Sequence, residues 1–374
     1  MSTALQFTDD QSMILDSARA FCAERSPMSA VRALLDDPHG YDPAVWQEMV
    51  ELGWPALAIP EEHGGAGLGI GTTVPLAESM GRALLSTPFF SVTLAAQALL
   101  RAGTEAQQDR WLPDLANGSV ATLALLDGGD WGAKSTSCAA VRSGDALRLS
   151  GAKHFVCDAG VAEAFVFWCL VDDADALVWV PRSALDRDAI SPSVVIDQTK
   201  RAGSVSFDGA EVPVENVLDA TRTGSALRDL RLLGAMLTAS EATGSAAACL
   251  DVIVDYLKTR KQFGQYIGSY QALKHPTVDV LNEMDGARSL IYHAATVVTD
   301  DALDADAEAA CRMAKAQASD ALCFAGDRAV QFHGGMGFTY ECDAQLFIRR
   351  AQWFAQHFGD AAHHRRRLAD LLLS

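Results

Sequence analysis

The 374-residue sequence has no closely spaced cysteine pair, no long apolar run and no basic leader at its start. Its eight cysteines are scattered without a CxxC pair, so the sequence gives no sign of a metal site or a dithiol redox motif. No apolar run approaches the roughly 20 residues of a membrane span, and no secretory signal is predicted. We therefore expect a cytoplasmic protein with reduced thiols that does not contact a membrane.

Positive charge is also scarce. Lysine and arginine number 30 against 48 aspartate and glutamate residues, which gives a formal net charge of −18. This balance argues against nucleic acid as a partner. The main basic cluster is the C-terminal HHRRR run, His363 to Arg367. A hydrophobic content of 49% is enough for a large core and argues against disorder.

Hydrophobic spacing predicts helices at both ends of the chain and short strands between them. We expect an α+β protein with domains at 1–118, 119–219 and 220–374, the middle one being an antiparallel sheet or barrel. A Thr8–Gln11 capping box opens the first predicted helix. The expected helices cover 5–35, 42–52, 72–84, 88–102, 105–116, 225–259, 269–299, 304–330, 341–357 and 360–373. The glycine-rich stretch 53–69 lacks the GKS or GKT of a phosphate-binding P-loop.

The stretch Tyr256 to His275 reads as a helix end, a glycine-bearing turn and the start of another helix. It brings Arg260, Gln262 and Phe263 close together at the helix end. Arginine is suited to forked recognition of phosphate. The alternative is an ordinary corner between two helices, with a solvated arginine.

The whole chain resembles the acyl-CoA dehydrogenase family. The resemblance rests on RKQFG (260–264), QFHGGMGFTYE (331–341), ELGWPALAIPEEHGGAGLG in the first domain and FDGAEVPVENVL at the end of the second. It implies an N-terminal helical domain, a middle β domain and a C-terminal four-helix bundle. It also implies FAD as cofactor, an acyl-CoA thioester as substrate, and an electron-transferring flavoprotein as acceptor.

In this family a subunit contacts the adenosine diphosphate part of its neighbour's FAD. The resemblance implies that the contacting residues here are Arg260, Gln262, Phe263, Gln271, Gln331, Gly334 and Gly335. Arg260 would bond the pyrophosphate in a forked geometry. Gly334 and Gly335 would let the backbone approach the cofactor closely. A plain helix cap is the alternative reading of these two glycines.

The chain departs from the family where the catalytic base should be. The usual glutamate position falls on Phe358, and the less common position on the preceding long helix falls on Gly234, followed by Ala235. No catalytic residue is identified, and Glu241 and Asp360 remain weak candidates. Glu241 lies two turns, roughly 10 Å, beyond Gly234, which is too far for a base without a shifted helix or substrate. The alternative is a buried, paired structural glutamate or one that faces a partner subunit.

The loop that usually binds the flavin ring is altered as well. It reads Leu126 to Ser135, LDGGDWGAKS, without the usual Thr-Glu-Pro and Gly-Ser-Asp. A later phrase has become Phe155 to Ala159, where Cys157 replaces a threonine hydroxyl by a weaker donor. The tail beyond Gly359 also differs from the family.

Three hypotheses follow. The chain resembles the base-lacking subunit of actinobacterial heterotetrameric acyl-CoA dehydrogenases of the steroid side-chain type, which complete the FAD site of a paralogous partner. Alternatively, it is a self-sufficient dehydrogenase with a relocated base, or a cofactor-free structural or regulatory paralogue. Steroid, branched and carrier-bound acyl groups all remain open as substrates.

Overall fold

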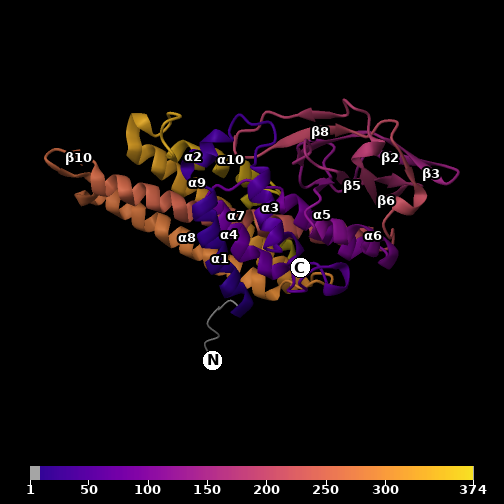
Figure 1. Cartoon of the computed structure of the whole chain (residues 1–374). Helices are drawn as coiled ribbons and strands as arrows, with labels where there is room; N and C mark the ends of the chain where they lie inside the picture. The colour runs from indigo at the N-terminus through magenta and orange to yellow at the C-terminus, as the bar shows by residue number, and fades with distance from the viewer. Residues whose placement is uncertain (1–8, 374) are drawn as a thin grey trace.

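The computed structural model describes residues 9–373, so the capping box expected at Thr8 lies partly outside them. A β domain forms one end of the molecule, and a long helical bundle extends to the other (Figure 1). The N-terminal helices pack between these two parts. One apolar core joins the N-terminal helices to the β domain, and a second fills the bundle and reaches the same helices.

Residues 9–118 contain six α-helices. Two of them, α1 and α2, lie in the segment 5–35, which was expected to be helical throughout. The structure divides that segment at Pro27, which lacks the amide hydrogen that a continuous helix needs. Asp42 and Thr104 cap the third and sixth helices with their side chains. The helices are α1 (Asp9–Arg25), α2 (Met28–Ala33), α3 (Pro43–Glu51), α4 (Thr73–Arg82), α5 (Phe89–Ala102) and α6 (Glu105–Ala116).

The β domain contains a six-stranded sheet and a three-stranded sheet. Most strand pairs are antiparallel as expected, but β1–β5 and β2–β5 are parallel, so the larger sheet is mixed. Strand β5 is buried along its length and reads as a continuous apolar run, which fits its central place. The strands are β1 (Ala121–Ala124), β2 (Ala139–Ser143), β3 (Ala146–Ser150), β4 (Ala152–Cys157), β5 (Ala164–Val171), β6 (Ala174–Pro181), β7 (Ile190–Pro192), β8 (Ala202–Ser206) and β9 (Glu211–Pro213).

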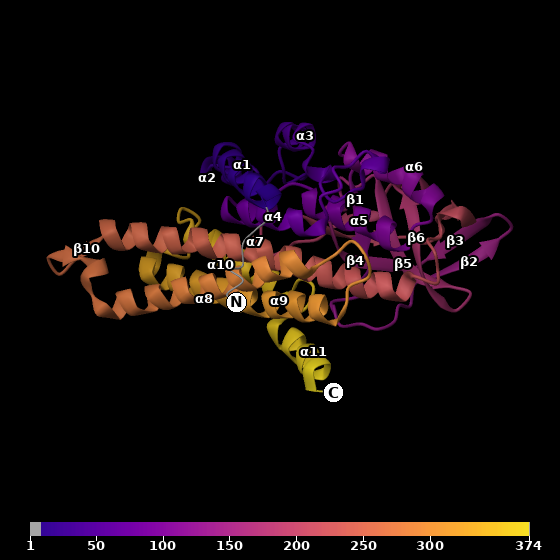
Figure 2. The same ribbon diagram turned by 90° about the horizontal axis from the view of Figure 1, so that it is seen from below.

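The C-terminal part is a bundle of long helices with a short hairpin at its far end. The helix α11 stands out from the bundle, as Figure 2 shows. The elements are α7 (Thr223–Thr259), β10 (Lys261–Gln262), β11 (Gln265–Tyr266), α8 (Gln271–Val297), α9 (Ala305–His333), α10 (Ala344–Gln356) and α11 (Ala361–Leu373), with a 3₁₀ turn, η7, at Gly334–Met336.

Helix α7 is the central element of the bundle. It is long and apolar enough to cross a membrane, but 72% of its most apolar window is buried inside the protein, as in a core helix. Glycines let it cross α4 closely. A Cβ on Gly81 would lie 2.0 Å from the carbonyl oxygen of Glu241, and one on Gly244 would lie 1.9 Å from that of Glu78. The crossing therefore requires glycine at both positions.

Candidate functional site

The two positions where the family would place a base face each other in the structure. Gly234 lies in α7, and Phe358 follows α10 with a φ of 57°. A Cβ on Gly234 would lie 2.4 Å from the phenyl ring of Phe358, so the ring fills the space above the glycine. Phe358 is only 6% exposed. Neither position carries a group that could accept a proton.

Phe358 belongs to an aromatic plug that consists of Phe90, Trp131, His357 and Phe358. The rings of Trp131 and Phe358 have centroids 4.3 Å apart, and those of Trp131 and His357 are 4.9 Å apart. Phe90 contacts His357 and Phe358 from α5. Three segments far apart in the sequence thus close one space with their side chains.

A buried lysine on β4 fixes the loop that carries Trp131. Lys153 is fully buried, pairs with Asp127 and donates to the Thr136 hydroxyl at 2.9 Å. Burial alone would raise the pKa of Asp127, but hydrogen bonds from Lys153, Ser137 and Thr136 hold it below its ordinary value. Both ends of the loop are therefore tied to the β domain, and Trp131 is held against Phe358.

A second buried lysine fixes the turn that carries Phe358. Lys315 on α9 donates to the carbonyl oxygens of Phe354 and Gly359, both at 2.9 Å, and to the Ser319 hydroxyl at 2.8 Å. Burial lowers the pKa of Lys315 to about 7. His364 Nε2 lies 2.9 Å from the Phe358 carbonyl oxygen and donates to it. These bonds hold the turn in one conformation.

His357 and Cys157 complete the inner wall of the plug. Burial, with the nearby cations Lys315 and Lys200, lowers the pKa of His357 to about 3, so the imidazole is neutral at pH 7. Burial raises the pKa of the Cys157 thiol, whose sulfur lies 3.7 Å from His357 Nε2. Neither group is a proton acceptor of ordinary strength here.

The cavity that remains inside the plug is very small. It lies between α5, β1, β4 and the turn after α10, where the resemblance places the flavin ring, and it measures about 20 Å³. A water molecule needs roughly 10–15 Å³ on this measure, so the space holds about one water. The residues present therefore do not fit the tricyclic flavin ring on this chain's own side.

The weak candidates for a base have other partners. Glu241 is 2% exposed and forms an ion pair with Lys200, whose Nζ lies 2.8 Å and 3.1 Å from its two carboxylate oxygens. Asp360 accepts a hydrogen bond from the His363 backbone N–H at 2.6 Å, at the start of α11. Both carboxylates are engaged within the chain.

One partly buried carboxylate near the plug, Asp158, was not singled out from the sequence. Asp158 accepts a hydrogen bond from the Ser91 hydroxyl at 2.6 Å, and burial raises its pKa to about 6. It follows Cys157 at the end of β4 and adopts a φ of 54°. Its only sequence signal was its place in the altered phrase at 155–159.

The residues implied to bind a neighbour's cofactor lie at the far tip of the bundle. Phe263 and Gly264 form the two-residue turn of the β10–β11 hairpin, with φ values of 51° and 82°. Phe263 is 93% exposed. A bulky residue in this left-handed region is strained, and such strain gathers at functional contacts. Arg260 is exposed beside the turn, and its side chain makes no hydrogen bond to any residue from 9 to 373.

The second glycine turn lies at the same tip. His333, at the end of α9, stacks on Tyr256 near the end of α7 with ring centroids 4.0 Å apart. Gly334 has a φ of 62° and a ψ of −138°, a conformation open essentially to glycine alone. Nothing lies within 4 Å of a Cβ built on Gly334 or Gly335. Gln262, Gln271 and Gln331 are also exposed here.

The tip and the plug lie far apart. Arg260 follows Gly234 by 26 residues along α7, which corresponds to roughly 39 Å. The hairpin lies at one end of the molecule and the β sheet at the other (Figures 1 and 2). The tip residues therefore lie too far from this chain's own β domain to contact a cofactor bound there.

Comparison with known proteins gives the same family over most of the chain. Residues 8–119 match the N-terminal domain of acyl-CoA dehydrogenases, and residues 230–373 match their C-terminal domain. Acyl-CoA dehydrogenase IpdE2 of Mycolicibacterium smegmatis is 30% identical over 362 residues, which cover 96% of this chain and 98% of that protein. IpdE2 of Mycobacterium tuberculosis is 29% identical and covers 93% of this chain and 92% of its own.

Two solved structures are similar along their full length. The steroid ACAD Tcur3481-Tcur3483, solved as a variant, has 25% identity, a TM-score of 0.83 and 98% coverage of both chains. The ChsE4-ChsE5 complex of Mycobacterium tuberculosis shares the fold, with 22% identity, a TM-score of 0.88, and coverage of 100% of this chain and 99% of that one. The chain belongs to the acyl-CoA dehydrogenase family, whose members are FAD-dependent oxidoreductases.

Proposed function

We propose that this chain is the supporting subunit of a heteromeric acyl-CoA dehydrogenase. Its partner is a paralogous subunit that carries the catalytic base and holds the flavin ring. The observation that carries the proposal is the aromatic plug, because Phe358 and Trp131 occupy the space in which this chain would need a flavin and a base.

The exposed tip of the bundle is the second feature that supports this function. Arg260, Gln262, Phe263, Gln271, Gln331, Gly334 and Gly335 are free to meet a neighbouring subunit. Arg260 would pair with the pyrophosphate of the partner's FAD, and the open backbone at Gly334 and Gly335 would lie against the cofactor. When bound in the partner, FAD supplies the hydride acceptor for α,β-desaturation of the acyl-CoA.

The similar proteins also support a role in a heteromeric acyl-CoA dehydrogenase. The ChsE4-ChsE5 complex pairs two differently named chains, and Tcur3481-Tcur3483 is a steroid ACAD. We accordingly propose a steroid or branched acyl-CoA as substrate. CarC, a subunit of a caffeyl-CoA reductase-Etf complex, is 27% identical to this chain, which supports an electron-transferring flavoprotein as acceptor. We assign the assembly to the cytoplasm.

The proposal predicts that neither weak candidate acts as a base. In the assembled complex, Glu241→Gln and Asp360→Asn should each keep turnover per bound FAD within about twofold of the wild type, because proton abstraction occurs on the partner. The matched control is Asp251→Asn on the exposed face of α7. Turnover lost in either variant while FAD stays bound would favour a self-sufficient enzyme with a relocated base.

A further inference from the structure

A small cavity lies where α2 and α3 pack against the segment that follows α4. It measures about 140 Å³, and neither the residues of the aromatic plug nor those of the tip line it. Its walls are mostly apolar, and Val31, Val45, Leu84 and Leu85 are buried around it. An apolar cavity of about 150 Å³ in another protein binds benzene, so this cavity has room for a single six-membered ring.

A strained turn forms the floor of this cavity. Leu84 is 1% exposed and has a φ of 51°, a left-handed conformation that is unfavourable for a bulky residue. The Ser26 hydroxyl donates to the Ala83 carbonyl oxygen at 2.9 Å, just before the strained residue. The Leu85 N–H donates to the Met80 carbonyl oxygen at 2.9 Å, just after it. Because both sides of the turn are tied down, the cavity is preformed.

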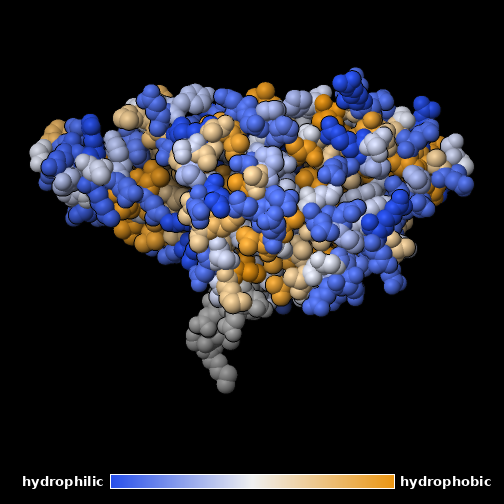
Figure 3. Space-filling model, viewed as in Figure 1, coloured by the Kyte–Doolittle hydropathy of each residue, from blue (hydrophilic) through white to orange (hydrophobic). Residues whose placement is uncertain are grey.

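The two charged residues that line the cavity already have partners. Arg25 pairs with Glu48 at 2.7 Å and with Glu24 at 3.0 Å. Asp42 accepts the Ala44 N–H at 2.8 Å as the cap of α3. The surface around α2 and α3 mixes hydrophilic and apolar residues (Figure 3). Since both charges are engaged within the chain, the cavity favours an uncharged ligand.

One hydroxyl in the cavity wall has no partner. The half-buried Ser86 side chain makes no hydrogen bond to any residue from 9 to 373. In the next residue, Thr87 Oγ1 is buried without a hydrogen-bond partner, and the residue is 6% exposed. Ser86 lines this cavity and also the small polar cavity beside Thr87, so the two residues form the wall between them. Buried hydroxyls are normally hydrogen-bonded, so this wall lacks a polar group that a ligand would supply.

We propose that this cavity binds a compact, uncharged ring that carries one hydroxyl or carbonyl group, of the size of phenol or cyclohexanone. The ring lies among Val31, Val45 and Leu84, and its burial supplies most of the binding free energy. Its oxygen bonds to Ser86, whose hydroxyl can both donate and accept. This site goes beyond the supporting role proposed above and does not depend on a partner.

The test uses the purified full chain and ligand-observed NMR titrations with phenol, cyclohexanone and benzene. The wild type should bind phenol or cyclohexanone at up to millimolar concentration, and benzene at least about threefold more weakly. Ser86→Ala should lower the affinity for the polar ring about three- to tenfold, the effect of one neutral hydrogen bond, and leave that for benzene within about twofold. Tighter binding of phenol would identify a hydroxyl as the group recognised, and tighter binding of cyclohexanone a carbonyl.

A second variant tests the position of the site. Ala30 on α2 lines the cavity, so Ala30→Leu places a branched side chain in it and should weaken binding of all three ligands at least about tenfold. The control Ala20→Leu makes the same change on the exposed face of α1 and should change affinity less than about twofold. Thermal melting without ligand shows that each variant is folded, and Ser86→Ala keeps the test valid if Ala30→Leu is overpacked.

The site and the class of ligand can each be contradicted. No binding of any of the three rings, or unchanged binding by a folded Ala30→Leu, would overturn the proposed site. Binding of benzene alone, or unchanged binding of phenol and cyclohexanone by Ser86→Ala, would overturn the role of the hydroxyl and with it the polar class of ligand.

Discussion

Replacing Asp229 by alanine is expected to lower the free energy of unfolding by about 3–5 kcal/mol, the usual effect of breaking a buried ion pair from one side. Arg101 and Asp229 are only 4% and 2% exposed in their side chains, and their closest atoms are 2.7 Å apart. Asp229 also accepts the Leu303 backbone N–H at 3.0 Å. Without the carboxylate, a buried guanidinium and a buried N–H would both lose an acceptor.

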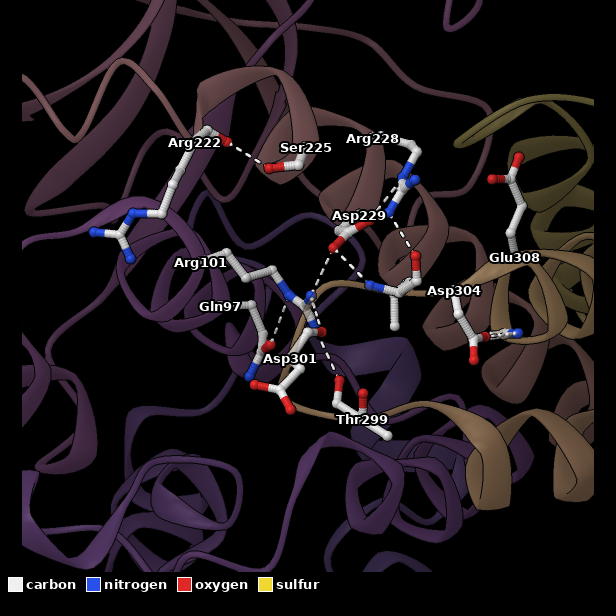
Figure 4. A network of polar contacts seen from close by, with 12 residues as sticks. Gln97, Arg101, Arg222, Ser225, Arg228, Asp229, Thr299, Asp301, Asp304 and Glu308 are labelled. Carbon is white, nitrogen blue, oxygen red and sulfur yellow. Dashed lines mark hydrogen bonds and ion pairs between the residues drawn. The ribbon is translucent and has the colours of Figure 1, made fainter.

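Arg101, on α5, also joins three separate segments of the chain. It donates to the Thr299 and Asp301 carbonyl oxygens at 2.9 Å and 2.7 Å, so the network ties α5, α7 and the loop before α9 together (Figure 4). The measurement is urea unfolding at pH 7, followed by helical circular dichroism. The control is Asp251→Ala, which removes an exposed partner of Arg82 from the same helix and should cost no more than about 1 kcal/mol. If Asp229→Ala and Asp251→Ala lost equal free energies of unfolding, the Arg101–Asp229 pair would not be the strongly stabilising contact described here.

The second large effect is expected at the tip. In the complex with its partner, Arg260→Ala should weaken FAD binding by roughly 10- to 150-fold, because a charge-assisted bond to phosphate contributes about 1.5–3 kcal/mol. The free chain should keep its stability, since the Arg260 side chain makes no hydrogen bond within the described part of the chain. FAD release from the complex, followed by flavin fluorescence, measures the change.

Lys258→Ala is the matched control for this variant. It removes the same charge two residues earlier, where the side chain leaves α7 in a different direction. FAD retention should then stay within about threefold of the wild type. If Arg260→Ala and Lys258→Ala retained FAD equally, Arg260 would not be a pyrophosphate ligand.

Hydrophobic content and spacing predicted most of the helices, including α7, which is buried on all sides between Leu232 and Ala247. The helix expected at 225–259 is α7 at Thr223–Thr259, and the pattern change near residue 120 precedes β1. The corner after α7 was also visible, since Gly264 and Gly268 interrupt the helical pattern. The parallel pairing of β1 with β5 was not, because strand order depends on contacts between residues about 40 positions apart.

The plug could not be predicted from the sequence in this detail. The resemblance located Gly234 and Phe358 separately, but only the fold shows that the ring of one fills the space left by the other. Lys315 gave no signal either, because its two carbonyl acceptors in the turn lie 39 and 44 residues further along the chain.

A count of bound flavin distinguishes a supporting subunit from a self-sufficient enzyme. The chain is produced alone and together with a paralogous partner, and FAD released from each purified protein is divided by the number of subunits. We expect almost no FAD on the chain alone and one FAD for every two subunits in the complex, because the plug leaves room for about one water where the flavin ring would lie. A yellow, active protein from the chain alone, with one FAD per subunit, would contradict it.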